Sequence, residues 1–151
     1  MKAVKVLFAV VFMIVFAIDS VADEHSIWMK DLDQAKQIAV TKNKPILVYF
    51  TGSDWCMWCM KLDKEVFSKQ EFKDYLKENF IPVVIDFPMY QEQSAAIRRK
   101  HEKLKAKYAV QGFPTLFLLN PQGKILAKSN YIPGGVSGVK KYLELAKQKM
   151  E

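Results

Sequence analysis

Two cysteines, Cys56 and Cys59, are the only cysteines in this 151-residue chain, and two residues separate them. They follow the apolar run Ile46–Phe50, which has the residue types of a short strand buried on both faces. Apolar residues at helical spacing come after them, through Leu62 and Phe67. A C-x-x-C pair between a strand and a helix is typical of a redox-active dithiol. No other disulfide can form within the chain.

Three other roles for the cysteine pair are less favoured. A structural disulfide closing so short a loop would stabilise the fold by roughly 2 kcal/mol, against about 3 for a 15-residue loop. A structural zinc ion takes four ligands, and only His25 and His101 remain, neither at ligand spacing from the pair. Haem attachment needs histidine after the second cysteine, where the chain has Met60. A redox role is therefore the leading hypothesis.

The first 22 residues have the pattern of a secretory signal peptide. Lys2 and Lys5 precede an apolar run over residues 6–18, and the small residues Ser20 and Ala22 predict cleavage after Ala22. The apolar run is shorter than the roughly 20 residues that span a bilayer; an uncleaved anchor is the alternative. We therefore expect an exported chain whose residues 23–151 form one domain, since they contain neither a repeat nor a Gly/Ser linker.

The remaining sequence alternates between helical and strand-like patterns. Helical spacing is found over residues 27–43, 56–67, 72–80, 91–108 and 136–150, and strand patterns over 46–50, 81–86, 116–119 and 124–127. The turn Asn120–Gly123 predicts an antiparallel hairpin between the last two strands. Ser53 or Asp54 could cap the helix that begins near Cys56. This order predicts an α/β fold with a small mixed sheet.

The position of each cysteine predicts its part in the chemistry. Cys56 would occupy the first turn of a helix, where free backbone N–H groups and the helix dipole favour a thiolate, the attacking species. Cys59, one turn deeper, would be the resolving thiol. Met57 and Trp58 bring neither a cation nor a strong donor to the Cys56 sulfur. We therefore expect a moderately lowered Cys56 pKa and a reducing potential.

Two motifs together resemble the thioredoxin superfamily: Trp55–Cys59 after a buried strand, and Gly112–Thr115 before a later one. The resemblance implies a thioredoxin fold, a small mixed sheet flanked by helices, with Pro114 in the cis form beside the disulfide. It also implies that the residue before this proline bonds an extended substrate through its backbone. The predicted catalytic residues are Cys56 and Cys59, and the predicted substrate-binding residues are Trp55, Met57, Trp58, Phe113 and Pro114.

Within the superfamily, the signal peptide, residues 50–55, the Cys-Met-Trp-Cys motif and residues 61–67 resemble exported bacterial proteins of the DsbH type. This resemblance implies a periplasmic disulfide reductase that acts on exported proteins through a mixed disulfide. A membrane electron donor of the DsbD type would re-reduce it. Disulfide oxidase or isomerase activity, or a non-catalytic binding or chaperone module, are the alternatives.

We expect no cofactor, no metal and a monomer. Nucleic acid is not an expected partner either, because the basic run over residues 98–107 lacks interleaved aromatic residues and predicts a solvated helix face. Thioredoxin itself has a buried aspartate in the strand before its cysteines, whereas this strand contains Val48, Tyr49 and Phe50. The proton acceptor for Cys59 is therefore open among Asp54, Glu65 and water.

Overall fold

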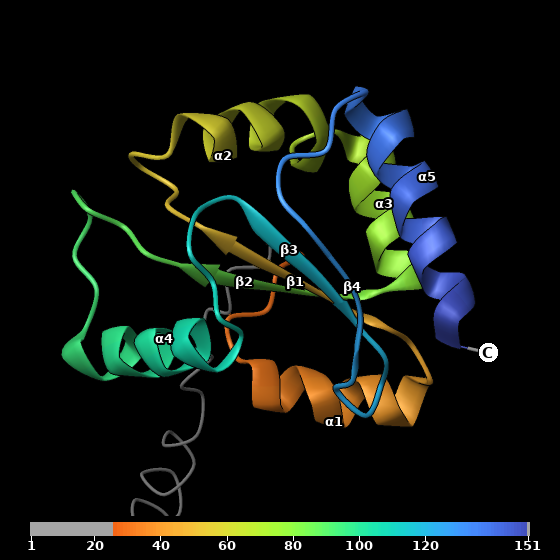
Figure 1. The fold of residues 1–151 in the computed structure, drawn as a ribbon, viewed down its shortest axis with the longest axis horizontal. Coiled ribbons are helices and arrows are strands. Elements are labelled where there is room, and N and C mark those ends of the chain that lie inside the picture. The colour runs from red at the N-terminus through yellow and green to blue at the C-terminus, as the bar shows by residue number, and fades with distance from the viewer. Residues whose placement is uncertain (1–25, 151) are drawn as a thin grey trace, which may run out of the picture.

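The computed structural model describes residues 26–150 (Figure 1). The predicted signal peptide, residues 1–22, lies outside the described residues. The strands within the described part are β1 (Ile46–Thr51), β2 (Ile81–Asp86), β3 (Thr115–Leu119) and β4 (Ile125–Ser129). The α-helices there are α1 (Leu32–Lys42), α2 (Met57–Leu62), α3 (Gln70–Asn79), α4 (Ala95–Lys107) and α5 (Gly135–Lys147). A π-helical turn, η2 (Asp63–Phe67), continues α2, and a 3₁₀ turn, η3 (Gln148–Met150), follows α5.

The strands form one mixed sheet in the order β2-β1-β3-β4, which confirms the predicted fold class. Strand β1 lies in the middle, parallel to β2 and antiparallel to β3, and β4 pairs antiparallel with β3. All six residues of β1 are buried, as expected for a strand covered on both faces. The hairpin turn forms as predicted, with Gly123 at φ 87°, a left-handed conformation that favours glycine.

Helices cover both faces of the sheet (Figure 1). Successive side chains of a strand point to opposite faces. Leu47 and Tyr49 accordingly pack into the core under α2, α3 and α5, whereas Ile46, Val48 and Phe50 pack into the core that includes α1. The cysteine pair belongs to the first of these cores. No helix within residues 26–150 is long and apolar enough to cross a membrane.

Two helices begin later than their apolar spacing predicts. Helix α1 begins at Leu32 rather than residue 27 because Asp31 caps it, accepting the N–H groups of Asp33 and Gln34, and because Met29 is bridged to Val83 of β2. Helix α4 begins at Ala95, after the cap residue Ser94, rather than at residue 91. The preceding residues 87–93 form a loop that is bonded to Asp54 and Trp55.

A third difference from the sequence prediction lies within the helix that follows the cysteines. The predicted continuous helix over residues 56–67 is α-helical only to Leu62 and continues as the π-helical turn η2. Short π-helical segments within helices occur frequently at functional sites. Here the turn begins with Asp63, whose side chain is half-buried, and ends with the buried Val66 and Phe67.

Candidate active site

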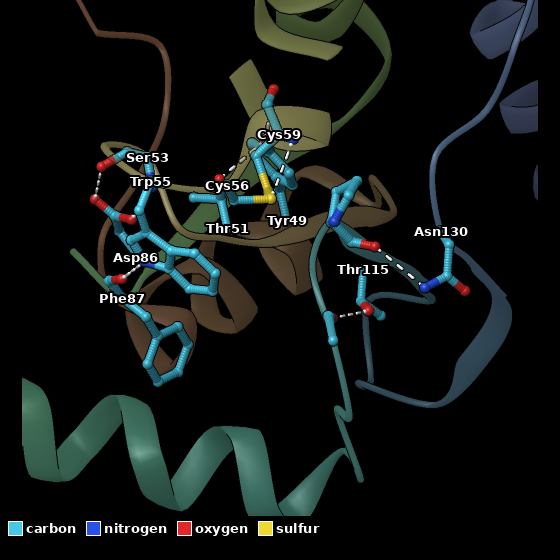
Figure 2. The surroundings of a disulfide bond; sticks show 12 residues. Tyr49, Thr51, Ser53, Trp55, Cys56, Cys59, Asp86, Phe87, Thr115 and Asn130 are labelled. Carbon is cyan, nitrogen blue, oxygen red and sulfur yellow. Dashed lines mark hydrogen bonds between the residues drawn. A yellow bond between two sulfur atoms is a disulfide. The ribbon is translucent and has the colours of Figure 1, made fainter. Parts of the chain in front are cut away.

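The structure joins Cys56 and Cys59 in a disulfide at the start of α2, with their Cα atoms 5.2 Å apart (Figure 2). Cys56 is the N-cap of the helix, and its Sγ accepts the N–H of Cys59 at 3.2 Å. Cys56 is 7% exposed and Cys59 is fully buried, so solvent reaches only the first cysteine. The sequence prediction of an outer and an inner sulfur is therefore confirmed.

The predicted cap of this helix was wrong. Ser53 and Asp54 both make other contacts, and the Cys56 sulfur takes the cap position. Ser53 donates from its N–H and its hydroxyl to the Asp86 carboxylate at the end of β2, at 3.0 and 2.6 Å. These bonds tie the turn before the cysteines to the sheet.

Asp54 fastens the loop over residues 87–93 to the same turn. Its carboxylate accepts the backbone N–H groups of Met89, Tyr90 and Gln91 at 2.8, 2.8 and 2.9 Å. These bonds, with that from Met89 the largest contribution, lower the pKa of Asp54. With its acceptors already occupied, Asp54 is a structural anchor rather than a free proton acceptor.

Trp55 and Phe113, two predicted substrate-binding residues, meet in one aromatic cluster. The Trp55 indole packs edge-on against Phe113 at 5.9 Å, and Phe113 stacks on Phe87 at 5.1 Å. The Trp55 Nε1 donates to the Phe87 carbonyl at 2.7 Å (Figure 2). A Cβ built on Gly52 would lie 2.5 Å from the indole, so only glycine leaves room for Trp55 in this position.

Pro114 follows a cis peptide bond, as the resemblance implies. Two side chains hold its loop: the Thr115 hydroxyl donates to the Gly112 carbonyl at 2.7 Å, and the Asn130 amide donates to the Pro114 carbonyl at 3.3 Å. Figure 2 shows this loop on the side of the disulfide opposite Asp86. The structure thus brings the two predicted motifs together around the disulfide.

Met57 and Trp58 lie at the surface, as predicted, and both are more than half exposed. Trp58 packs against Tyr131 at 5.0 Å, and the Lys61 ammonium lies 5.1 Å from the Trp58 ring. The Tyr131 hydroxyl donates to Glu65 at 2.5 Å, which occupies another of the predicted proton acceptors. Sequence reasoning missed Tyr131 because its contacts come from residues more than 60 positions away.

Asp63 is the acidic residue that sequence reasoning missed near Cys59. It follows Cys59 by one helical turn, and its backbone N–H is bonded to the Cys59 carbonyl. Burial raises the pKa of Asp63 to about 6. Its spacing of four residues from Cys59 was the signal that could have found it.

Tyr49 of β1 contacts the Cys59 backbone from below the helix. Its hydroxyl donates to the Cys59 carbonyl at 3.4 Å and accepts from the Thr51 hydroxyl at 3.0 Å. Burial, together with the nearby Asp63 charge, raises the pKa of Tyr49 above its ordinary value, so the phenol stays protonated.

A cavity of about 620 Å³ opens beside these residues, and Tyr49, Thr51, Asp63, Asp86 and His101 all contribute to its wall. Asp63 therefore follows the buried inner cysteine by one helical turn and lines a hollow that is open to solvent. Within residues 26–150, no group of three or more His, Cys, Asp or Glu side chains is placed to hold a metal ion.

Three comparisons place this geometry among known proteins. The family model of the thioredoxin-like domain matches residues 32–147. The chain is 42% identical over 118 residues to the disulfide bond reductase DsbH of Chlamydia pneumoniae, covering 76% of this chain and 69% of that protein.

It is also 33% identical over 94 residues to the thioredoxin-related protein DsbJ of Chlamydia pneumoniae, covering 62% of this chain and 27% of that protein. A solved structure of a DsbH oxidoreductase superposes with a TM-score of 0.75 at 36% identity, covering 80% of this chain and 83% of the other.

Proposed function

Because the chain belongs to the thioredoxin-like family and is a thiol–disulfide oxidoreductase of the DsbH type, we propose that it reduces disulfides in exported proteins. The observation that carries this proposal is the pairing of an outer Cys56, at a helix N-terminus, with a fully buried Cys59. The outer sulfur can meet a substrate, and the inner sulfur is protected from any partner except Cys56.

The reaction runs in two exchanges. The Cys56 thiolate attacks one sulfur of the substrate disulfide, the S–S bond breaks, and the leaving thiolate takes a proton from solvent. Cys59 then loses its proton and attacks the Cys56 sulfur of the mixed disulfide, which releases the second substrate thiolate. Two electrons pass from the dithiol to the substrate, and the protein is left with the Cys56–Cys59 disulfide seen in the structure.

The first exchange relies on the helix that follows Cys56. The Cys56 sulfur already accepts one backbone N–H, from Cys59, and the same bond would stabilise its thiolate. Met57 and Trp58 add neither a cation nor a strong donor, so this stabilisation is moderate. A moderately stabilised thiolate supports the reducing direction, since a strongly stabilised one would make the protein an oxidant.

Asp63 is the proton acceptor for Cys59 in this proposal. Asp54 and Glu65, the acids named from the sequence, are bonded to the loop amides and to Tyr131. Asp63 follows Cys59 by one turn, faces the open cavity and has a pKa of about 6, close to the range that suits a general base at neutral pH. Tyr49, which stays protonated, holds the Cys59 carbonyl and so orients this turn of the helix.

The cellular setting belongs to the same proposal. Residues 1–22 would act as a cleaved signal peptide, residues 23–151 would work as a monomer in the periplasm, and a membrane donor of the DsbD type would return the disulfide to the dithiol. Trp55, Met57, Trp58, Phe113 and Pro114 would contact the substrate. This is supported by the packing of Trp55, the residue before Cys56, against Phe113 at the cis-proline.

The redox equilibrium with glutathione tests the direction of electron flow. A disulfide reductase should be mostly oxidised in an oxidising glutathione buffer, because its dithiol gives up electrons readily. A protein that stays mostly reduced in that buffer would contradict the reductase assignment and favour an oxidase. Failure to exchange with any disulfide would instead favour a non-catalytic module.

A further inference from the structure

The loop over residues 87–93, between β2 and α4, is held against the turn that carries Cys56. Asp54 and Trp55, the two residues immediately before Cys56, both bond to the backbone of this loop. Asp54 accepts three of its N–H groups, and the Trp55 indole donates to its Phe87 carbonyl. Figure 1 shows the loop extending from the end of β2 beside the start of α2.

The tip of this loop presents two large side chains to solvent. Met89 is 62% exposed and Tyr90 is 78% exposed. Trp55, itself partly exposed, directly precedes Cys56 and bonds to Phe87 of the same loop, so it joins the loop to the turn that carries the reactive sulfur. Adjoining exposed apolar side chains of this kind mark interaction sites on soluble proteins.

The reactive Cys56 sulfur beside this surface indicates what kind of molecule would bind there. A substrate joined to Cys56 through a sulfur must extend across the rim of the site, and a polypeptide substrate has side chains on either side of its cysteine. Methionine adapts to apolar groups of many shapes, and tyrosine offers a flat apolar face with a polar end. The bonds to Asp54 fix the loop before binding, which lowers the entropy cost of using it.

We propose that Met89 and Tyr90 bind an apolar or aromatic side chain near the cysteine of a flexible polypeptide substrate. The protein would then discriminate in favour of polypeptide disulfides and against small disulfides that cannot reach the tip. This inference rests on the proposed function and specifies its substrate class.

The test measures single-turnover oxidation of the pre-reduced protein, by acid quench and thiol labelling, with three disulfides. The first is a synthetic peptide disulfide with phenylalanine beside its cysteine, the second is the same peptide with serine in that place, and the third is bis(2-hydroxyethyl) disulfide. The wild type is compared with the double variant Met89→Ser, Tyr90→Ser. The matched controls are Val40→Ser on α1 and Leu145→Ser on α5, exposed apolar residues on other elements.

For the double variant we expect the rate constant with the phenylalanine peptide to fall about tenfold, which corresponds to losing about 1.4 kcal/mol of binding. The rates with the serine peptide and the small disulfide should change less than about twofold, and the controls should match the wild type. Asp54→Ala, which releases the loop without altering its tip, should cause the same selective loss.

An unchanged rate with the phenylalanine peptide, or an equal loss with all three disulfides, would overturn the inference. If light scattering shows a wild-type dimer that the double variant abolishes, the tip covers a second copy of the chain and the polypeptide occupant is wrong. A wild type that reacts with none of the disulfides would instead refute the proposed function, so the two failures are distinguishable.

Discussion

Replacing Asp63, the proposed proton acceptor, with asparagine is expected to stabilise the oxidised protein at neutral pH. The reason is the position of the carboxyl group. Burial raises the pKa of Asp63 to about 6, which means that the folded protein holds the charged form less favourably than the unfolded chain does. Asparagine has nearly the same shape and no charge, so it removes that unfavourable ionisation.

The size of the effect follows from the pKa difference. A rise from 3.8 to about 6 is about 2 units, and at 1.36 kcal/mol per unit the ceiling is about 3 kcal/mol. Because the carboxyl group borders an open cavity, solvent screening reduces the expected gain to about 1–2 kcal/mol.

The contribution of Asp63 to the free energy of unfolding depends on pH. Below about pH 4 the carboxyl group is protonated in the folded and in the unfolded protein, so it does not destabilise the fold. As the pH rises, the unfolded chain releases this proton before the folded protein does. The stability due to the protonated form is thus lost between about pH 4 and 6, and the penalty is complete above about pH 6.

Several other charged or titratable groups line the same cavities as Asp63. Besides Tyr49 on β1, these groups come from β2, α3, α4 and the segment before α1: Asp86, Lys73, Lys100, His101, Lys30 and Asp31. They are unchanged in the variant, so the difference between the two proteins isolates Asp63.

Urea unfolding of the oxidised wild type and of Asp63→Asn, from pH 4 to pH 8, measures this difference from the two midpoints at equal slope. Oxidised protein is used because reduced Cys59 would add its own titration. Glu78→Gln, on the exposed side of α3, controls for the change in net charge. A stability difference independent of pH, or a less stable variant at pH 7, would refute the reasoning.

Three further predictions concern the site itself. In Asp63→Asn, rapid-quench kinetics should show substrate release from the mixed disulfide slowed by about 10²-fold with the first exchange unaffected, the size of effect typical of a lost general base; equal slowing of both exchanges would contradict it. Cys59→Ala should accumulate mixed disulfides through Cys56, visible on non-reducing gels and absent from a Cys56→Ala, Cys59→Ala control. Gly52→Ala should displace the Trp55 indole and cost about 1–3 kcal/mol in urea unfolding, an overpacking effect; unchanged stability and tryptophan fluorescence would show that the turn can absorb the methyl group.

Features that depend on neighbouring residues could be predicted from the sequence. The buried strand β1, the outer position of Cys56, the inner position of Cys59 and the hairpin turn all follow from local pattern. The cis form of Pro114 came from the family resemblance, because a cis bond has no local signature strong enough to predict it.

Features that depend on contacts between distant segments could not be predicted. Asp54 resembled a helix cap because it stands before a helix, but its carboxylate binds amides of the loop 35 or more residues later. Residues 91–94 resembled part of a helix, yet those same bonds hold their first residue in the loop. Asp63 stands two residues before Glu65 on the same helical stretch, and only the folded structure shows which of these two acids is buried enough for its pKa to rise.

The way Asp54 holds the loop over residues 87–93 determines which substitutions the loop can accept. Every one of its bonds goes to a main-chain N–H group, so the anchor does not depend on which side chains occupy positions 89 and 90. Proline is the exception, since it lacks the N–H group. The side chains at positions 89 and 90 can therefore be varied while the bonds that hold the loop stay the same. A combinatorial library at these positions that leaves out proline should yield folded proteins, which makes the loop suitable for directed evolution.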